Sequence, residues 1–364
     1  MDPKYIIEDA RPLSEFKDKT FSGFKKRDVI NALFKSIETG KIENACYWIT
    51  ECIISGYTVD IYEKLIQFSS KVIHINSPNL PEFLWRRYST FHKSIDHIGK
   101  NEKDKYIHLR NTESIRNNLV DIVVTMTVSP KTKRYDKYPK IDESKDYQFT
   151  VIKDKLNATM QLLPSHIIKF TDPEELRIIM NEIFFNLKNK LGGYDRCVYW
   201  VQWLIKWEKK NRKNKQKYEI EGRNIQGIHI KFCKDIIWLV WSVVLEEASL
   251  REEPIKKQIQ SLYLFFKYEF TSGRRNARLP LLFHSMGYLT LPLNFKVPIR
   301  KDKHIFIQTQ CNINMMFQTK KKKEQKTYLA PPNPAKSSKK VIDIGIEINQ
   351  DRMNIMQQLD EITM

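Results

Sequence analysis

Glycine is scarce in this sequence, and the phosphate-binding loops built from it are missing. The 364 residues include eleven glycines, and neither Gly-x-Gly-x-x-Gly nor Gly-x-x-x-x-Gly-Lys-(Ser/Thr) occurs. The nearest approach, residues 39–42 (Thr-Gly-Lys-Ile), lacks the first glycine and the final hydroxyl. The sequence therefore gives no indication of nucleotide hydrolysis.

Cysteine is also sparse, and its spacing fits neither a disulfide scaffold nor a zinc site. No Cys-x-x-Cys, His-Glu-x-x-His or His-x-x-x-His occurs, and a chain of this length can bury a core without disulfides. The odd number of scattered cysteines predicts a reducing, intracellular location, and we expect no metal or other cofactor. The five cysteines are Cys46, Cys52, Cys197, Cys233 and Cys311.

Signals for catalysis and for membrane insertion are missing as well. No Gly-x-Ser-x-Gly elbow or strand-borne Asp-x-Asp pair is found, so we expect a protein that is not an enzyme, with an unrecognised activity as the third alternative. The first ten residues lack the basic and apolar regions of a signal peptide. Apolar stretches such as 236–245 are shorter than the roughly 18 residues of a membrane span.

What the sequence has in excess is positive charge, and most of it lies in two stretches. The net charge is +19; residues 206–217 hold seven basic residues and one acid, and residues 318–340 hold eight lysines and one acid. Such clusters indicate a polyanionic partner: nucleic acid first, with DNA favoured over RNA, and an anionic membrane surface second. The alternative is a set of solvated lysine-rich surfaces, since the whole chain is rich in Lys, Ile, Asn and Tyr.

The first basic stretch mixes aromatic residues with its cations. Trp207 and Tyr218 could stack on bases while the neighbouring lysines neutralise phosphates. A second segment, residues 271–278, sets three arginines beside a glycine, and the equal alternative is a charged helix connection. For Trp85-Arg86-Arg87-Tyr88 a structural role is favoured. The predicted nucleic-acid-binding residues are Lys209, Lys210, Arg212, Lys213, Lys215, Lys217, Arg223, Arg274, Arg275 and Arg278.

Three blocks of the sequence recur in the same order, which predicts an internal duplication. Residues 27–37 (RDVINALFKSI) match 177–187 (RIIMNEIFFNL), and 43–53 (ENACYWITECI) match 195–205 (DRCVYWVQWLI). Residues 59–68 match 234–243, with a basic insertion at 206–233 before this block in the second copy. Ser22 is the expected N-cap of the first helix in the first copy, and Asp172 that of the first helix in the second copy. In the second block the apolar residues follow helical spacing, and Cys46 and Cys52 align with Val198 and Leu204. We therefore expect these thiols to be packed in a core.

The predicted fold is mostly α-helical, with two homologous helical bundles. Residues 117–129 indicate a buried helix, although their Val and Thr content leaves a strand open, and a short hairpin is expected near 291–310. The predicted parts are an N-terminal arm (1–21), the first bundle (22–128), a polar linker (129–150), the second bundle (151–310), a disordered Lys/Pro-rich tail (311–340) and a short C-terminal helix (341–364).

One local resemblance adds to this reading. Residues 35–37 (Lys-Ser-Ile), 45–49 (Ala-Cys-Tyr-Trp-Ile) and 53–56 (Ile-Ile-Ser-Gly) resemble the helical collar of clamp-loader-like AAA+ ATPases of the replication-associated recombination family. The likeness covers about 60 residues without the ATPase domain. It implies a helical assembly module and carries over no nucleotide hydrolysis.

A broader resemblance rests on residues 43–48, 115–117, 129–131, 172–176, 181–182 and 196–200. Through these residues the chain resembles an uncharacterised protein family of nucleocytoplasmic large DNA viruses. That implies a role in viral replication, transcription or packaging, in the cytoplasmic factory or the nucleus. From their charge alone, the tail lysines could also act as a nuclear import signal. We expect a nucleic-acid-binding or assembly module that contacts viral proteins through its helical faces, with a homo-oligomer as one option. The alternative is a minor virion structural or core protein that bridges its neighbours.

Overall fold

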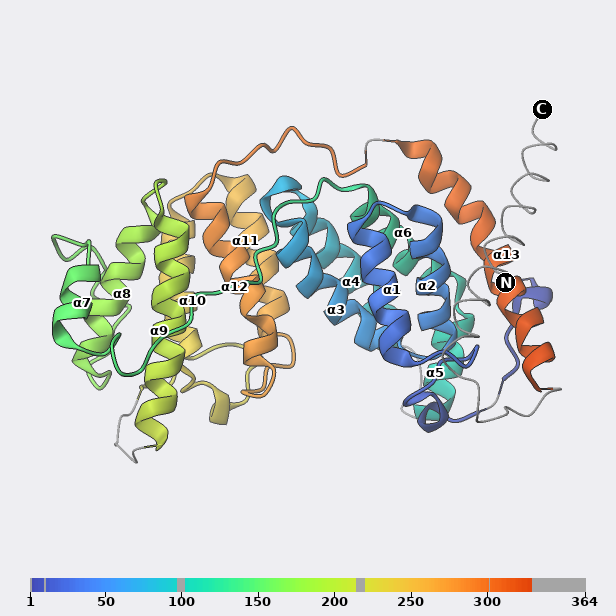
Figure 1. Cartoon of the computed structure of the whole chain (residues 1–364), viewed down its shortest axis with the longest axis horizontal. Coiled ribbons are helices and arrows are strands. Elements are labelled where there is room, and N and C mark those ends of the chain that lie inside the picture. Colours follow the sequence, from blue (N-terminus) through green and yellow to red (C-terminus); the bar gives the residue numbers. More distant parts are fainter. Residues whose placement is uncertain (1, 10, 97–101, 214–219, 301, 329–364) are drawn as a thin grey trace. The chain divides into compact units, whose positions relative to one another are not determined.

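The computed structural model describes residues 2–9, 11–96, 102–213, 220–300 and 302–328, and these residues are mostly helical, with no β-strand among them. The predicted all-α class is confirmed. Residues 1–318 form one compact unit, and residues 319–364 are a second unit. The first half of the large unit consists of α1 (Lys26–Glu38), α2 (Ile42–Ile54), α3 (Thr58–Val72), α4 (Leu80–Asp96), α5 (Glu102–Asn111) and α6 (Glu113–Val128) (Figure 1).

The second half follows a linker that lacks regular structure. Its helices are α7 (Phe149–Lys155), α8 (Glu174–Leu187), α9 (Gly193–Lys213), α10 (Ile236–Ser249), α11 (Glu253–Lys267) and α12 (Arg275–Thr290), and α13 (Lys303–Tyr328) comes last. Four 3₁₀ turns complete the described elements: η1 (Pro3–Tyr5), η2 (Leu13–Phe16), η3 (His74–Asn76) and η4 (Ile230–Phe232).

Helix α2 buries the apolar face that its spacing predicts. Ala45, Ile49 and Ile53 have no exposed surface, and burying an isoleucine side chain contributes about 1.5–3 kcal/mol. Cys46 and Cys52 are 1% and 0% exposed on the same helix, so the packing interpretation of these thiols is confirmed.

The segment whose secondary structure the sequence left open is a helix. Leu119, Val123, Val124 and Met126 of α6 are fully buried, and the helix contacts α1, α2 and α4. A helix that is covered on most sides can carry β-branched residues around its circumference, because burial outweighs their modest loss of helix propensity. Tertiary packing thus decides between helix and strand here.

Each half contains one helix that packs on at least four other helices of the same half. α6 packs on α1, α2, α3 and α4, and α12 packs on α8, α9, α10 and α11. A buried arginine is the fourth residue of both α6 and α12: Arg116 donates to the carbonyl of Arg110 (2.6 Å), and Arg278 donates to the carbonyl of Phe266 (2.8 Å). Each guanidinium satisfies a carbonyl near the end of the preceding helix, where partners within the helix are lacking. The duplication itself stays a prediction.

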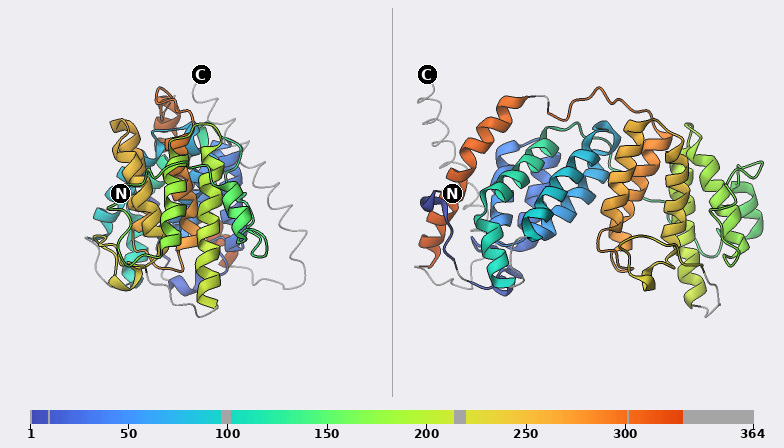
Figure 2. Two further views of the ribbon diagram at one scale, coloured as in Figure 1. Left: turned by 90° about the vertical axis from the view of Figure 1, so that its left-hand side faces the viewer. Right: turned by 180° about the vertical axis from the view of Figure 1, so that it is seen from behind.

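The halves meet along α3 and α4 of the first and α11 and α12 of the second (Figures 1 and 2). Aromatic pairs fill this junction, with ring centroids 5.0 Å apart for Trp85 and Phe265 and 5.3 Å apart for Tyr88 and Tyr268. Gln258 adds a polar contact, because its side-chain oxygen accepts from the backbone N–H of Glu82 (2.9 Å). Both halves therefore belong to one unit, and the predicted boundary between separate bundles stays a prediction.

Both predicted N-caps are wrong. α1 begins at Lys26 and α8 at Glu174, one turn or less beyond the expected sites. Ser22 instead donates its hydroxyl to Glu51 (2.8 Å). Asp172 accepts from backbone N–H groups of Lys169 and Glu221 and from a buried arginine. Long-range partners outcompete local capping at both positions.

The segment 291–310 also differs from the prediction. The described residues there form no hairpin; an irregular stretch follows α12, and α13 begins at Lys303. The predicted tail at 311–340 is helical as far as Tyr328, which fits the good helix propensity of lysine. Residues 329–340 and the predicted helix at 341–364 lie outside the described residues.

Candidate nucleic-acid interface

Helix α9 changes character along its length. Cys197, Trp200 and Leu204 in its first part are 0–1% exposed, and burial raises the pKa of the Cys197 thiol well above its usual range. From Lys206 to Lys213 the helix carries five basic residues and one acid. The negative end of the helix dipole favours cations in these last turns. One helix thus joins a buried anchor to a basic end.

The cations of this basic end have different surroundings. Lys209 and Lys213 are exposed and form no ion pair within the part of the chain that the structure describes. Lys210 lies 4.5 Å above the ring of Tyr147, and Arg212 pairs with Glu208 at 2.9 Å. Lys215 and Lys217, the other two predicted residues of this stretch, lie outside the described residues.

A buried ion-pair cluster brings the second arginine segment to the same place. Arg275 at the start of α12 lies 2.7 Å from both Glu208 of α9 and Asp235, the N-cap of α10. Burial opposes the charged guanidinium, but the Asp235 and Glu208 carboxylates raise the pKa of Arg275 above its ordinary value. The cluster therefore fixes the loop that carries Arg274 beside the last turns of α9.

Arg274 is the exposed member of the second segment. Its side chain is 44% exposed, and its guanidinium lies 3.3 Å from a carboxylate oxygen of the still more exposed Glu269. Exposed pairs of this kind contribute little to stability, so the guanidinium can exchange Glu269 for another anion at small cost.

Three predicted phosphate-binding arginines are instead internal. Arg275 is 11% exposed at its side chain, and Arg278 is 3% exposed and bonds Glu63 at 2.9 Å. Arg223 is buried against Asp172 at 2.8 Å; burial opposes ionisation of that carboxyl, yet Arg223 and two backbone N–H groups hold the pKa of Asp172 below its usual value. These arginines stabilise the fold, and we exclude them from the interface.

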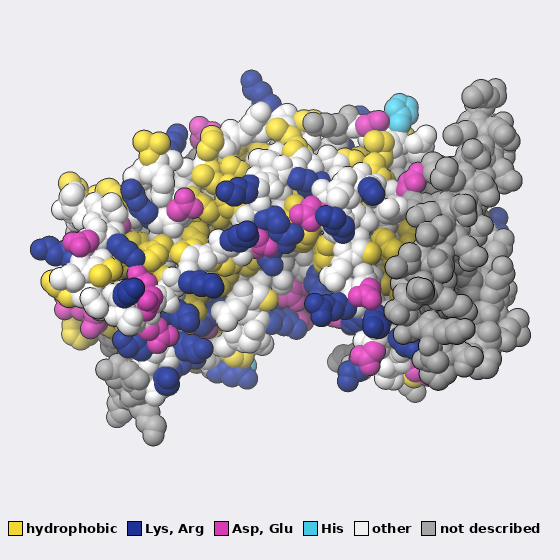
Figure 3. Space-filling view, viewed as in Figure 1, with side chains coloured by type: hydrophobic (Ala, Val, Ile, Leu, Met, Phe, Trp, Pro, Cys, Tyr) yellow, Lys and Arg dark blue, Asp and Glu magenta, His cyan; other side chains and the backbone are white. Residues whose placement is uncertain are grey.

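Two lysines that the sequence did not single out lie close to the basic end. Lys234 is exposed and directly precedes Asp235, which bonds Arg275, and Lys231 is exposed with its ammonium 4.9 Å above the ring of Phe232. In the sequence, Lys234 could have been singled out because it directly precedes Asp235, a residue type typical of helix N-caps. Basic side chains gather around the end of α9, at the lower left of the space-filling view (Figure 3).

Of the two rings predicted to stack on bases, the structure describes Trp207, and this ring packs against the core. Trp207 is partly buried, and its ring stacks on Trp203 with centroids 6.5 Å apart. Tyr147 contacts Trp203 on one side and lies under Lys210. Tyr218 lies outside the described residues. Base stacking by Trp207 would require repacking, which leaves phosphate contacts as the better-supported mode.

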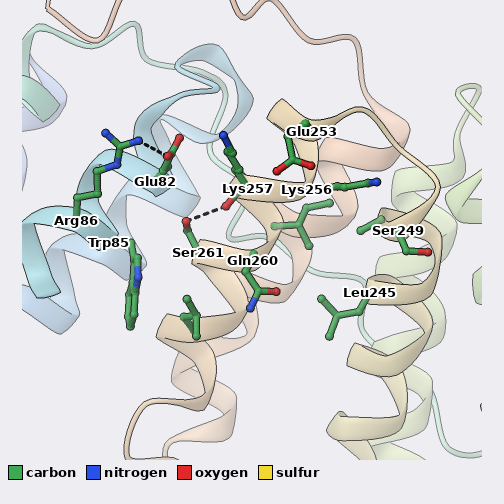
Figure 4. A pocket seen from close by; sticks show the side chains of 13 residues that line it. Glu82, Trp85, Arg86, Leu245, Ser249, Glu253, Lys256, Lys257, Gln260 and Ser261 are labelled. Carbon is green, nitrogen blue, oxygen red and sulfur yellow. Dashed lines mark hydrogen bonds and ion pairs between the residues drawn. The ribbon is translucent and has the colours of Figure 1, made fainter.

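Other chemistry finds little support in the described part of the chain. It contains no group of three or more His, Cys, Asp or Glu side chains arranged to hold a metal ion. No helix within the described ranges is long and apolar enough to cross a bilayer. An open hollow of about 590 Å³ lies between α4, α10 and α11, where Trp85 and Leu245 flank Gln260 (Figure 4).

Comparison with known proteins yields no relative: no protein-family model, curated protein or solved structure matches this chain.

Proposed function

We propose that this protein is a non-enzymatic nucleic-acid-binding or assembly module that contacts the phosphate backbone with the basic end of α9. The observation that carries the proposal is the group of exposed cations Lys209, Lys213 and Arg274, which the Glu208–Arg275 ion pair brings to one end of the helical unit. Exposed cations at one end of the unit suit a polyanion that carries regular negative charge. Because the nearby rings are packed, duplex DNA is favoured over a single strand.

A salt titration tests the proposal. Fluorescence anisotropy with a labelled 20-base-pair DNA should give an apparent affinity that falls linearly with salt concentration on logarithmic axes. Replacing Lys209, Lys210, Arg212 and Lys213 by glutamine should reduce the slope by up to about 3.6, since each phosphate contact contributes about 0.9. A labelled single strand of the same length should bind less tightly.

A matched control removes four exposed lysines of the first half: Lys17, Lys19, Lys25 and Lys41. The net charge changes equally, so a slope reduced as much in this variant would show a general charge effect and refute a defined interface. Binding that is weak at low salt or independent of salt would refute nucleic-acid binding altogether.

The viral setting of this function is proposed from the sequence resemblance alone. Replication, transcription or packaging in a viral factory or nucleus would each place the protein beside DNA. Affinity purification from infected cells, with and without nuclease, would separate partners held by nucleic acid from partners held by protein.

A second candidate is a minor virion component that bridges neighbouring proteins. The observation that favours it is a pair of exposed apolar side chains, Leu191 at 84% and Leu250 at 65%. Lys188 pairs with Glu247 at 3.3 Å, so the loops that follow α8 and α10 lie at the same end of the bundle. Exposed leucines on neighbouring loops suit a protein contact. Mass spectrometry of purified particles should find the chain abundant if this candidate holds and scarce if it is a replication factor.

A further inference from the structure

A single buried carboxylate holds two arginines from segments far apart in the chain. The Asp121 side chain in α6 is 2% exposed; Arg87 of α4 forms an ion pair with it, and Nη2 of Arg300 lies 2.6 Å from its Oδ1. The two arginine side chains remain 36% and 34% exposed. Asp121 therefore fixes one edge of each guanidinium, and the centre of the Phe306 ring lies 4.7 Å from the guanidinium carbon of Arg300.

These arginines open onto a hollow of about 690 Å³ between α4 and the segment 298–300. Phe83 forms part of its wall, and the guanidinium carbons of Arg87 and Arg300 lie 5.4 and 5.5 Å from the centre of that ring. Asn79 ties the segment to α4, because its side-chain N–H donates to the carbonyl of Phe295 (3.0 Å). The hollow thus has a rigid aromatic wall and two oriented guanidiniums.

The charges around this hollow do not cancel. Three arginines line it, and the acids that pair with them are Asp121 and Glu82, the second of which binds Arg86 along α4 (Figure 4). One positive charge is left over. Each guanidinium has five N–H donors, so contact with Asp121 leaves several of them available. Within the described residues neither Arg87 nor Arg300 has a second carboxylate partner.

We propose that this hollow binds a phosphate group, carried by a small phosphate monoester or free as inorganic phosphate. Arg87 and Arg300 donate to the phosphate oxygens, as paired guanidiniums do to oxyanions. The apolar wall of Phe83, Pro298 and Ile299 accommodates the organic part of a monoester. Asp121 positions both arginines before the ligand arrives. The site involves none of the cations at the end of α9, so the proposal does not depend on nucleic-acid binding.

Isothermal titration calorimetry on the full chain tests the proposal with three probes: AMP, adenosine and inorganic phosphate. AMP should bind with one site per chain and adenosine should not bind, because only the first carries a phosphate. If inorganic phosphate binds more weakly than AMP, the site is assigned to a phosphate monoester. If the two affinities are equal, the site is assigned to free phosphate. The absence of saturable binding by both phosphate probes, or equal binding of adenosine and AMP, would overturn the proposal.

Variants locate the binding in the hollow. Arg300→Gln should weaken AMP binding about tenfold, while Asp121 keeps its pair with Arg87. Arg134→Gln removes the same charge from an exposed arginine that pairs with Asp136 elsewhere and should change nothing. If Arg300→Gln fails to fold, Ile299→Glu keeps both arginines and adds a repelling charge to the wall. An AMP affinity that is unchanged in folded Arg300→Gln or Ile299→Glu protein would contradict the site. Salt-dependent DNA binding should persist in both of these variants.

Discussion

His74 and His284 stack face to face at the junction of the two halves, with ring centroids 4.4 Å apart and ring planes 25° from parallel. His74 is fully buried in the left-handed conformation (φ +49°), and Tyr135 stacks 4.0 Å from its ring. Gly287 makes room for it, because a Cβ there would lie 2.5 Å from Cε1 of His74. Neither ring nitrogen of His74 has a hydrogen-bond partner among the described residues.

We expect this pair to make the protein less stable in acid. Burial lowers the pKa of His284 to about 3. Burial also lowers the pKa of His74 well below its usual value, and the neighbouring His284 ring adds to this shift. In the unfolded chain both imidazoles bind protons near pH 6.5, whereas in the folded chain they stay neutral. The stabilising contribution is therefore complete above pH 6.5 and is lost as pH falls. From pH 7.5 to 5.5 the free energy of unfolding should drop by about 1.4 kcal/mol for each histidine.

Urea denaturation at a series of pH values measures this effect. His284→Phe should remove about half of the acid-dependent loss, whatever the packing change does to stability at pH 7.5. His304→Gln, at an exposed histidine, should leave the pH dependence unchanged. A wild-type unfolding free energy that does not change between pH 7.5 and 5.5 would contradict the assignment.

Arg274, the N-cap of α12, and Arg278, inside that helix, should differ sharply in their effect on stability. Arg278→Ala leaves the carbonyls of Phe266 and Tyr268 without their side-chain donor and removes the ion-pair partner of Glu63, so we expect a loss of about 1–3 kcal/mol. Arg274→Gln should change the unfolding free energy by less than about 0.5 kcal/mol, because its pair is exposed. Thermal melting followed by circular dichroism compares them. Equal melting temperatures for the two variants would show that the burial of Arg278 is wrongly assigned.

The cysteines should divide by accessibility to thiol reagents. Cys311 is exposed, whereas Cys46, Cys52, Cys197 and Cys233 are buried. Thiolates react and buried thiols do not ionise readily, so one equivalent of a disulfide reagent should be consumed quickly by the native protein and five after denaturation. Cys311→Ser should abolish the fast reaction. Rapid modification of two or more thiols in the native state would contradict the burial of Cys46, Cys52, Cys197 and Cys233.

Much of the fold is visible in the sequence because helical packing leaves a local pattern. The spacing of Ala45, Ile49 and Ile53 predicts the buried face of α2, and the alignment of Cys52 with Leu204 predicts a packing role for that thiol. The cap residues were predicted less well. Ser22 and Asp172 have the composition of N-caps, but each bonds groups at least 29 residues away in preference to the nearest helix.

In the candidate interface, too, local sequence patterns predicted some features and long-range contacts decided the others. Charge and helical periodicity are local properties, so the sequence by itself determined a mostly α-helical chain in which the basic stretch 206–217 directly follows the apolar helical block 195–205. It could not separate exposed Arg274 from buried Arg275, because the partner of Arg275 is Glu208, 67 residues earlier. Only the tertiary structure decides which cations meet carboxylates inside the fold and which remain free to meet an external anion. Burial makes that difference, since a charge taken out of water must be paired, whereas one left in water need not be.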